Sequence, residues 1–170
     1  MNFIPTDSES KTARAIYAAG CFWGVEYYFK QASGVISTQV GYTGGQTVNP
    51  TYQEVCSGAT GHKEAIEVIF DPAKTSFEEL TKLYFEIHDF SQTDGQGPDL
   101  GDQYLSYIFY TDETQKQVAE NLIARLRQKG FRVSTVLEKA GDFYPAELYH
   151  QDYYSKTGKK TYCHFRRKIF

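Results

Sequence analysis

Two strand-like segments, 35–42 and 62–70, follow one another in the sequence with no helical segment between them. The first alternates polar and apolar side chains, and the second is the clearest strand pattern in the chain and ends at Asp71-Pro72. A doubly wound α/β fold would place a helix between consecutive parallel strands. This stretch therefore argues against a doubly wound fold.

The rest of the chain alternates helical and strand patterns. A helix over 76–88 begins at Ser76, where Glu79 has the spacing of a capping box, and a second amphipathic helix over 112–129 ends just before Gly130. The other predicted elements are strands over 13–18, 104–110 and 133–137, a helix over 22–30 and a short helix over 146–154. This order predicts an α+β protein, a two-layer α/β sandwich with helices on one face of a mixed sheet.

Length and composition fit one folded unit. With 170 residues, of which 41% are hydrophobic and 23% are charged, the chain has the size and balance of one globular domain. We expect residues 1–12 to form a disordered N-terminal segment. We expect residues 13–170 to form a single catalytic domain that includes the C-terminal tail.

Charge and cysteine content limit the partners and the compartment. The chain has 18 basic and 21 acidic residues, and this net charge of −3 gives no support for a nucleic-acid or polybasic membrane binder. Its apolar runs are far shorter than the ~20 residues that span a bilayer, and residues 1–11 lack the pattern of a secretion signal. The odd number of cysteines, three, fits a reducing compartment and thiol chemistry, so we expect a cytoplasmic protein.

Cys21 is the first candidate catalytic residue. It follows the strand over 13–18 and Gly20, and it immediately precedes the helix over 22–30. A thiol at the N-terminus of a helix lies at the positive end of the helix dipole, which favours the thiolate. The alternative is a buried structural cysteine, which is the common state of an isolated cysteine.

Glu64 is the second candidate. Because side chains in a strand alternate between two faces, Glu64 shares a face with Ile66, Val68 and Phe70. If that face is the core, desolvation raises the pKa of the carboxyl group and lets it hold a proton near neutral pH, as a general acid requires. The alternative is that Glu64 lies just beyond the buried zone, in contact with solvent.

Two further groups of residues raise the question of a metal site. Asp94, Asp99 and Asp102 lie in a glycine-rich loop, but their spacing does not match an EF-hand, and a solvated loop is the simpler interpretation. The pair Cys163-His164, taken with His150, lacks the paired spacing of a structural zinc site. We therefore expect no metal.

Residues 20–26, GCFWGVE, resemble the active-site signature of the A-type peptide methionine sulfoxide reductases. Further segments are similar to that family and follow the family's order: 41–45, 49–64, 97–104 and 149–154. The similarity runs from about Ala15 to His164. It implies a ferredoxin-like plait elaborated with extra segments, and an enzyme that reduces the S epimer of methionine sulfoxide, free or in proteins.

The resemblance also implies roles for individual residues. Cys21 is the nucleophile, Glu64 protonates the sulfoxide oxygen, and the resulting sulfenic acid is resolved by a second thiol, Cys163. The residues that bind substrate are Phe22 and Trp23 at the S-methyl group, Tyr52 and Tyr104 at the oxygen, and Asp99, which helps build the site. Thioredoxin reduces the disulfide, no metal or organic cofactor is needed, and we expect a monomer.

The chain departs from the family pattern at two places. Leu105 follows Tyr104 where the family commonly has arginine, so a positive charge near the site is lost. The tail carries a single cysteine, Cys163, where some members carry two. We assign Cys163 as the resolving thiol because we expect its polar, basic tail to be mobile. We expect Cys56 to be a partly buried residue held by its own strand or turn.

The residues alone leave two other functions possible. A cysteine hydrolase or acyltransferase would pair Cys21 with His62 or His150. A module that binds single-stranded nucleic acid or sugars would use exposed aromatic residues, and aromatic residues make up 16% of the chain. The net charge of −3 and the lack of a basic stripe count against the binding module.

Overall fold

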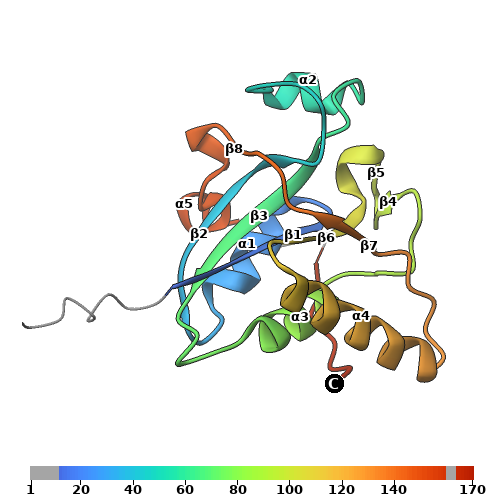
Figure 1. Cartoon of the computed structure of the whole chain (residues 1–170). Coiled ribbons are helices and arrows are strands. Elements are labelled where there is room, and N and C mark those ends of the chain that lie inside the picture. The colour runs from blue at the N-terminus through green and yellow to red at the C-terminus, as the bar shows by residue number, and fades with distance from the viewer. Residues whose placement is uncertain (1–11, 160–163) are drawn as a thin grey trace, which may run out of the picture.

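The computed structural model describes residues 12–159 and 164–170 (Figure 1). The strands of its larger sheet are β1 (Ala13–Ala19), β2 (Val35–Thr43), β3 (Lys63–Phe70), β6 (Ser106–Tyr110), β7 (Val136–Lys139) and β8 (Phe143–Pro145). In this part of the chain they lie in the order β7-β6-β1-β3-β2-β8. Neighbouring strands are antiparallel except β6 and β7, which are parallel. The sheet is therefore mixed, and the predicted α+β class is confirmed.

One face of the sheet is covered by helices (Figure 1): α1 (Phe22–Lys30), α3 (Phe77–Glu86) and α4 (Glu113–Gln128). Tyr17 of β1 is fully buried in this interface. Its ring stacks on Phe29 of α1 at 5.2 Å and on Phe77 and Tyr84 of α3 at 5.9 and 4.9 Å. Burial of these large rings between the two layers is a major stabilising contribution. Among the described residues, none of the helices combines the length and hydropathy needed to cross a bilayer.

The opposite face of the sheet packs against the chain between β7 and β8, which crosses the strands in Figure 1. Ile16 and Phe109 are buried there, with Ala140 and Phe143 packed against them. Successive residues of a strand point to opposite faces, so Ile16 enters this smaller core while Tyr17 enters the larger one.

The long helices begin where the sequence predicts. Ser76 Oγ accepts a hydrogen bond from the backbone N–H of Glu79 at 3.1 Å, and Asp112 Oδ1 accepts one from Gln115 at 2.8 Å. These caps satisfy N–H groups that have no partner within the helix. The short elements are α2 (Tyr52–Cys56), β4 (Gly95–Gln96), β5 (Asp99–Leu100), α5 (Tyr153–Thr157) and the 3₁₀ helices η1 (Asp102–Tyr104) and η2 (Leu148–His150).

Two predicted elements near the C-terminal end differ from the structure. β7 begins at Val136, later than predicted, because Ser134 hydrogen-bonds to the carbonyl of Phe90 through its backbone N–H and its Oγ, both at 2.7 Å. The helix predicted over 146–154 is divided into η2 and α5. Asp152, with a left-handed backbone at φ 54°, separates the two.

Residues 52–56, for which the sequence predicts no helix, form the short helix α2 between β2 and β3. The helix begins at Thr51, which forms a capping box with Glu54: the Thr51 side chain accepts from the Glu54 N–H, and the Glu54 side chain accepts from the Thr51 N–H. Cys56 is the last residue of this surface helix and is exposed. The prediction that Cys56 is partly buried is therefore wrong.

The C-terminal segment 164–170 packs against α3 and is not the mobile tail that its composition predicts. The carboxyl group of Glu86 accepts hydrogen bonds from the side chain of Arg166 and from the backbone N–H groups of Ile169 and Phe170, between 2.9 and 3.3 Å. A sequence does not reveal such an acceptor, because Glu86 is a buried carboxyl on a distant helix.

His164 holds the other end of this segment close to the start of α1. Its side chain is 1% exposed, and its Nε2–H donates a 2.6 Å hydrogen bond to the backbone oxygen of Ala19. Cys163, the residue before it and the predicted resolving thiol, lies outside the described residues.

Candidate active site

Cys21 lies at the junction between β1 and α1, where the chain turns from the sheet into the helix. Gly20 makes this turn with a φ of +89°, a conformation that favours glycine, and a Cβ atom there would lie 2.6 Å from Gln96 Cβ. Cys21 is the N-cap residue of α1 and is 6% exposed. The predicted position of this thiol, at the N-terminus of a helix, is confirmed.

Glu64 lies near the beginning of β3 and reaches the first turn of α1. Its side chain is 2% exposed and shares the core face with Val68, so of the two alternatives left open by the sequence the buried one holds. Glu64 Oε1 accepts a 3.3 Å hydrogen bond from the backbone N–H of Phe22, the residue after Cys21. Its Oε2 accepts a 3.4 Å hydrogen bond from Gln103 Nε2. The carboxyl group therefore contacts the residue next to the candidate nucleophile.

Burial raises the pKa of Glu64 from 4.5 to about 8. Desolvation is the largest effect, because a buried carboxylate loses its hydration. Hydrogen bonds from Phe22, Gln103 and Tyr104 lower this pKa, and the negative charge of Asp99 raises it. Desolvation outweighs the hydrogen bonds, so Glu64 carries a proton at pH 7.

Tyr52 of α2 and Tyr104 of η1 bring two phenol groups to this carboxyl group. Hydrogen bonding by Tyr104 lowers the pKa of Glu64, and hydrogen bonding by Tyr52 lowers the pKa of Tyr104. Burial raises the pKa of both tyrosines above the ordinary value of 10, and the charge of Glu64 adds to this effect. Both groups are therefore O–H donors near neutral pH.

Cys56 belongs to the same cluster, which the sequence analysis does not predict. Gln103 Nε2 lies 3.3 Å from Cys56 Sγ and 3.4 Å from Glu64 Oε2. Hydrogen bonding to this thiol also raises the pKa of Tyr52. The side-chain amide of Gln103 thus links the sulfur of Cys56 to the carboxyl group of Glu64.

Phe22 and Trp23, in the first turn of α1, pack with rings from the C-terminal part of the chain. Phe22 is 1% exposed and Trp23 is half-buried. The Trp23 ring stacks on Tyr153 of α5 at 3.7 Å and 8°, and its Nε1–H donates a 2.9 Å hydrogen bond to His150 Nδ1. The ring of His150 lies 4.5 Å from that of Tyr52. These contacts connect the predicted apolar pair with the predicted phenol donors.

Asp99 of β5 is half-buried and influences the site through its charge, since its carboxylate raises the pKa of Glu64. Leu105, which follows η1, is half-buried. The positive charge at this edge belongs to Lys63, whose Nζ lies 2.9 Å from Asp102 Oδ2. A basic group is therefore present beside η1 although residue 105 is leucine.

The two histidines proposed as partners of a hydrolase nucleophile are engaged elsewhere. His62 Nε2–H donates to the backbone oxygen of Thr47 at 2.7 Å, and its Nδ1 accepts from the N–H of Gly45 at 3.0 Å. His150 Nδ1 is taken by Trp23. Within residues 12–159 and 164–170, no three His, Cys, Asp or Glu side chains are grouped so that they would hold a metal ion.

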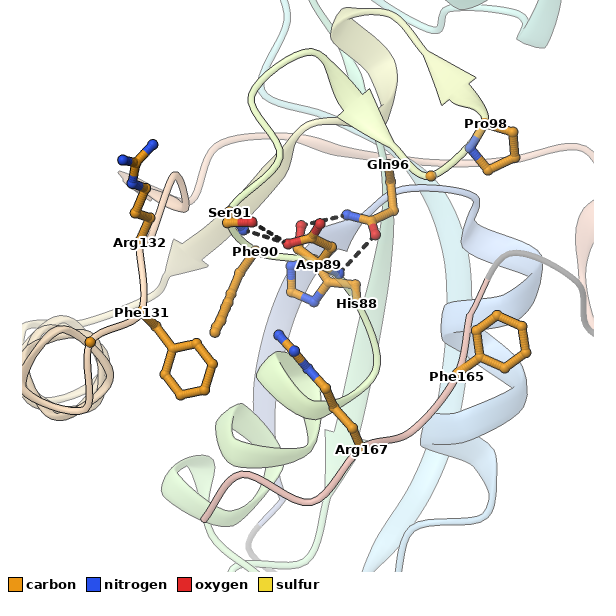
Figure 2. Close-up of a pocket in the computed structure, with 12 residues that line it drawn as sticks. His88, Asp89, Phe90, Ser91, Gln96, Pro98, Phe131, Arg132, Phe165 and Arg167 are labelled. Atoms are coloured by element: carbon orange, nitrogen blue, oxygen red, sulfur yellow. Dashed lines mark hydrogen bonds between the residues drawn. The ribbon is translucent and has the colours of Figure 1, made fainter.

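A pocket of about 620 Å³ opens beside the C-terminal segment (Figure 2). Arg167 points into it, and the centre of its guanidinium group lies 5.6 Å from the Phe90 ring and 5.5 Å from the Phe131 ring. None of the candidate site residues that the structure describes lines this pocket. The candidate catalytic cluster, which consists of Glu64, Tyr52, Tyr104 and Cys56, therefore lies outside this cavity.

Three residues that the sequence analysis does not assign complete the site: Gln103, Glu147 and Tyr153. Glu147 accepts hydrogen bonds from the backbone N–H of Tyr52 at 3.1 Å and from the hydroxyl of Tyr42 at 2.9 Å, and so fixes the start of α2. Gln103 and Tyr153 lie within motif segments, next to residues that were assigned. Glu147 lies outside them, and no sequence signal would have found it.

Comparisons with known proteins agree with this site. The family profile described as peptide methionine sulfoxide reductase matches residues 13–170. The peptide methionine sulfoxide reductase MsrA of Methanothermobacter thermautotrophicus is 45% identical over 163 residues, which cover 94% of this chain and 96% of that protein. MsrA of Erwinia tasmaniensis is 47% identical over 154 residues, which cover 89% and 86%.

Solved structures show the same fold. Mxr1 from Saccharomyces cerevisiae in its reduced form has a TM-score of 0.86 and 31% identity, with 98% of this chain and 96% of that chain covered. Methionine sulfoxide reductase A of Corynebacterium diphtheriae has a TM-score of 0.77 and 37% identity, with 86% and 76% covered. The chain therefore belongs to the peptide methionine sulfoxide reductase family, oxidoreductases that reduce methionine sulfoxide.

Proposed function

We propose that this chain reduces the S epimer of methionine sulfoxide, free or in proteins, with Cys21 as the nucleophile and Glu64 as the general acid. The observation that carries this proposal is the 2% exposed carboxyl group of Glu64, which accepts a hydrogen bond from the N–H of the residue after Cys21 and whose pKa is raised by burial. A sulfoxide sulfur accepts a nucleophile only when its oxygen is protonated or strongly hydrogen-bonded. A buried carboxylic acid with phenol neighbours supplies that activation.

The substrate oxygen binds among Glu64, Tyr52 and Tyr104, and the S-methyl group lies against Phe22 and Trp23. Both tyrosines are neutral donors, which supports hydrogen bonding to an oxygen that gains negative charge. The Phe22 and Trp23 rings offer an apolar surface for the methyl group. Asp99 supports the site by helping to keep the proton on the acid.

The first step transfers oxygen from the substrate to Cys21. The thiolate attacks the substrate sulfur while Glu64 gives its proton to the oxygen. The protonated oxygen then passes as a hydroxyl group from the substrate sulfur to the sulfur of Cys21. The sulfur–oxygen bond of the substrate and the new sulfur–sulfur bond both break, methionine leaves with the electron pair, and Cys21 is left as a sulfenic acid. The sulfur of the substrate is reduced by two electrons, and the sulfur of Cys21 is oxidised by two.

The second step restores Cys21. The thiol of Cys163 displaces water from the sulfenic acid and forms a disulfide, which the dithiol of thioredoxin reduces by exchange. Yeast Mxr1, which shares this fold, has been solved in complex with Trx2, and this supports a thioredoxin partner for the present chain. Electrons come from this dithiol, so the proposal includes no metal and no organic cofactor.

We also propose that the fold is a ferredoxin-like plait. The chain order β1-α1-β2-β3-α3-β6 and the spatial order β6-β1-β3-β2 support a ferredoxin-like plait, to which β7 and β8 are additions. A single domain over 13–170, a monomeric state and a cytoplasmic location are also part of the proposal.

The experiment measures dithiol-driven reduction of the separated S and R epimers of a methionine sulfoxide peptide. We expect the wild-type protein to reduce the S epimer only and Cys21→Ser to be inactive. Cys56→Ser is the matched control, because it removes the other sulfur of the site while leaving the nucleophile. Reduction of the sulfoxide by Cys21→Ser would contradict the proposal.

A further inference from the structure

His150 of η2 is buried among the aromatic rings of the proposed substrate site. Its ring lies 5.1 Å from Phe22, 5.6 Å from Trp23, 4.5 Å from Tyr52 and 4.0 Å from Tyr149, and its side chain is 1% exposed. The roles proposed above assign nothing to this residue, although three of these four rings belong to residues proposed to bind substrate.

The contact with Trp23 fixes the protonation of the His150 ring. The indole Nε1–H can only donate, and it lies 2.9 Å from His150 Nδ1. Nδ1 must therefore present its lone pair, and the single proton of the neutral ring must lie on Nε2. Burial lowers the pKa of His150, and the carboxylate of Glu147 opposes this effect only in part. The neutral form that accepts from Trp23 is thus the stable one at pH 7.

The other nitrogen of the ring shows that this arrangement is not ordinary packing. His150 Nε2 is buried and has no hydrogen-bond partner among residues 12–159 and 164–170. A buried N–H without a partner destabilises a folded protein, whereas an apolar side chain at the same place would carry no such penalty. Among the described residues, the hydrogen bond that the His150 side chain makes is the one it accepts from Trp23.

Trp23 is held at two points as a result. One face of the indole stacks on Tyr153 at 3.7 Å and 8°, and its N–H edge is bound to His150. The stack fixes the plane of the ring, and the hydrogen bond fixes its rotation within that plane. The remaining surface of the half-buried indole is then presented in one orientation.

We propose that His150 is a positioning residue: it accepts the indole N–H of Trp23 and thereby sets the shape of the pocket that admits an S-methyl group and rejects larger S-alkyl groups. The inference rests on the proposed role of Trp23 in binding the substrate. It extends that role by naming the group that determines how the indole is turned. An indole free to rotate would accommodate an ethyl group as readily as a methyl group.

The structural arm of the test uses the single tryptophan of the chain. The ¹⁵N–¹H spectrum contains one indole resonance, and its shift and solvent exchange report this hydrogen bond without any need for activity. In His150→Leu, which removes the acceptor, we expect the indole proton to move upfield and to exchange faster. In His150→Asn, whose Oδ1 takes the place of Nδ1, we expect both properties to return toward those of the wild type. Backbone amide dispersion in the same spectrum shows that each variant is folded.

The kinetic arm compares kcat/KM for methionine sulfoxide with kcat/KM for its S-ethyl analogue. One additional methylene group in a tight apolar pocket is discriminated by ~10–200-fold. We expect the methyl preference to fall by ~10-fold in His150→Leu, at the lower end of what such a pocket provides, and to be restored in His150→Asn. In a Trp23→Phe background, which has no N–H to donate, His150→Leu should cause no further loss.

The two arms separate the inference from the function on which it rests. A wild-type protein that fails to reduce the sulfoxide contradicts the proposed function and leaves the indole spectrum to test the hydrogen bond. An unchanged indole resonance in His150→Leu contradicts the positioning role. An unchanged methyl preference in an active His150→Leu protein with an altered resonance also contradicts it, because the hydrogen bond would then not determine specificity.

Discussion

The backbone N–H of Phe22 donates a 3.3 Å hydrogen bond to Glu64 Oε1, which joins the first turn of α1 to a buried carboxyl group on β3. Cys21, the residue before Phe22, caps the same helix. The proposed nucleophile and the proposed acid are thus held by one junction between the sheet and the helix layer. Any change that moves α1 relative to β3 should affect both groups together.

Replacing Glu64 with glutamine removes the transferable proton while keeping a polar group of similar size. We expect Glu64→Gln to slow single-turnover sulfoxide reduction by ~10²–10⁴-fold, the usual contribution of a general acid. The wild-type rate should fall as pH rises through about 8, where Glu64 loses its proton. Rapid-quench measurements of methionine release across pH test both expectations.

The glutamine variant should also lose the pH dependence that Glu64 causes. A rate for Glu64→Gln equal to that of the wild type, with the same fall near pH 8, would assign the proton to another group or to water. Glu120→Gln, an exposed carboxyl on α4, is the matched control and should behave as the wild type.

The same substitution should stabilise the protein at neutral pH. The folded-state pKa of Glu64 is raised, so its favourable contribution is complete below pH 4.5 and is lost as pH rises to about 8. Because glutamine cannot ionise, its contribution to the free energy of unfolding does not change over this pH range. We expect Glu64→Gln to exceed the wild type in free energy of unfolding by ~3 kcal/mol at pH 7, because each pH unit corresponds to ~1.4 kcal/mol.

Urea unfolding of both proteins at several pH values between 4.5 and 8 measures this difference. It should grow with pH inside that range and stay constant below it. A difference that does not change with pH would show that Glu64 ionises normally in the folded protein. Such a result would also remove the basis for its action as an acid at pH 7.

The parts of this fold that the sequence predicts are those set by local patterns. The alternation over 62–70 places Glu64 on the same face as Ile66 and Val68, which the structure shows to be the core face. Capping residues give the start of α3 at Ser76 and of α4 at Asp112. Each of these depends on neighbours within a few residues. For the same reason, Cys21 could be placed at the start of a helix from its flanking residues.

The parts that the sequence does not predict depend on contacts between distant segments. Cys56 joins the active site because Gln103 of η1 bridges it to Glu64. The C-terminal segment is fixed because Glu86 of α3 accepts its backbone N–H groups. Composition suggests mobility for such a basic segment, but a single buried acceptor is sufficient to hold it.

We expect a side chain at position 24 to destabilise the protein, because the C-terminal segment lies against α1 there. A Cβ atom at this position would clash with His164 Nδ1, and the His164 ring is fixed by its hydrogen bond to Ala19. Alanine in a helix gains up to ~1 kcal/mol over glycine, whereas overpacking costs ~1–3 kcal/mol. We therefore expect Gly24→Ala to lower the free energy of unfolding by ~1 kcal/mol and to increase proteolysis of the C-terminal segment.

Removing the opposing ring should reverse the effect of this substitution. In a His164→Ala background, Gly24→Ala should be neutral or stabilising, because the added methyl group then has space. Gly141→Ala, at a position with open space around it, is the control and should change stability by less than ~0.5 kcal/mol. A destabilisation by Gly24→Ala that persists without the His164 ring would contradict this account.

The last prediction concerns which thiol resolves the oxidised Cys21. Cys56 is exposed and is connected to Glu64 through Gln103, so it is a real competitor for this role. His164, however, is the neighbour of Cys163 in the chain, and it lies against Ala19, close to Cys21 in the sequence. A disulfide requires Cα atoms within ~7 Å of each other. His164 is thus anchored against residues that flank Cys21 on both sides, Ala19 and Gly24, which supports Cys163 over Cys56.

The test adds one equivalent of methionine sulfoxide to the reduced protein and identifies the disulfide by peptide mass. We expect a bridge between Cys21 and Cys163. Cys163→Ser should release one equivalent of methionine and then fail to turn over with thioredoxin, because its sulfenic acid has no resolving thiol. Cys56→Ser should retain thioredoxin-driven turnover. A bridge between Cys21 and Cys56, or full thioredoxin-driven turnover by Cys163→Ser, would transfer the resolving role to Cys56.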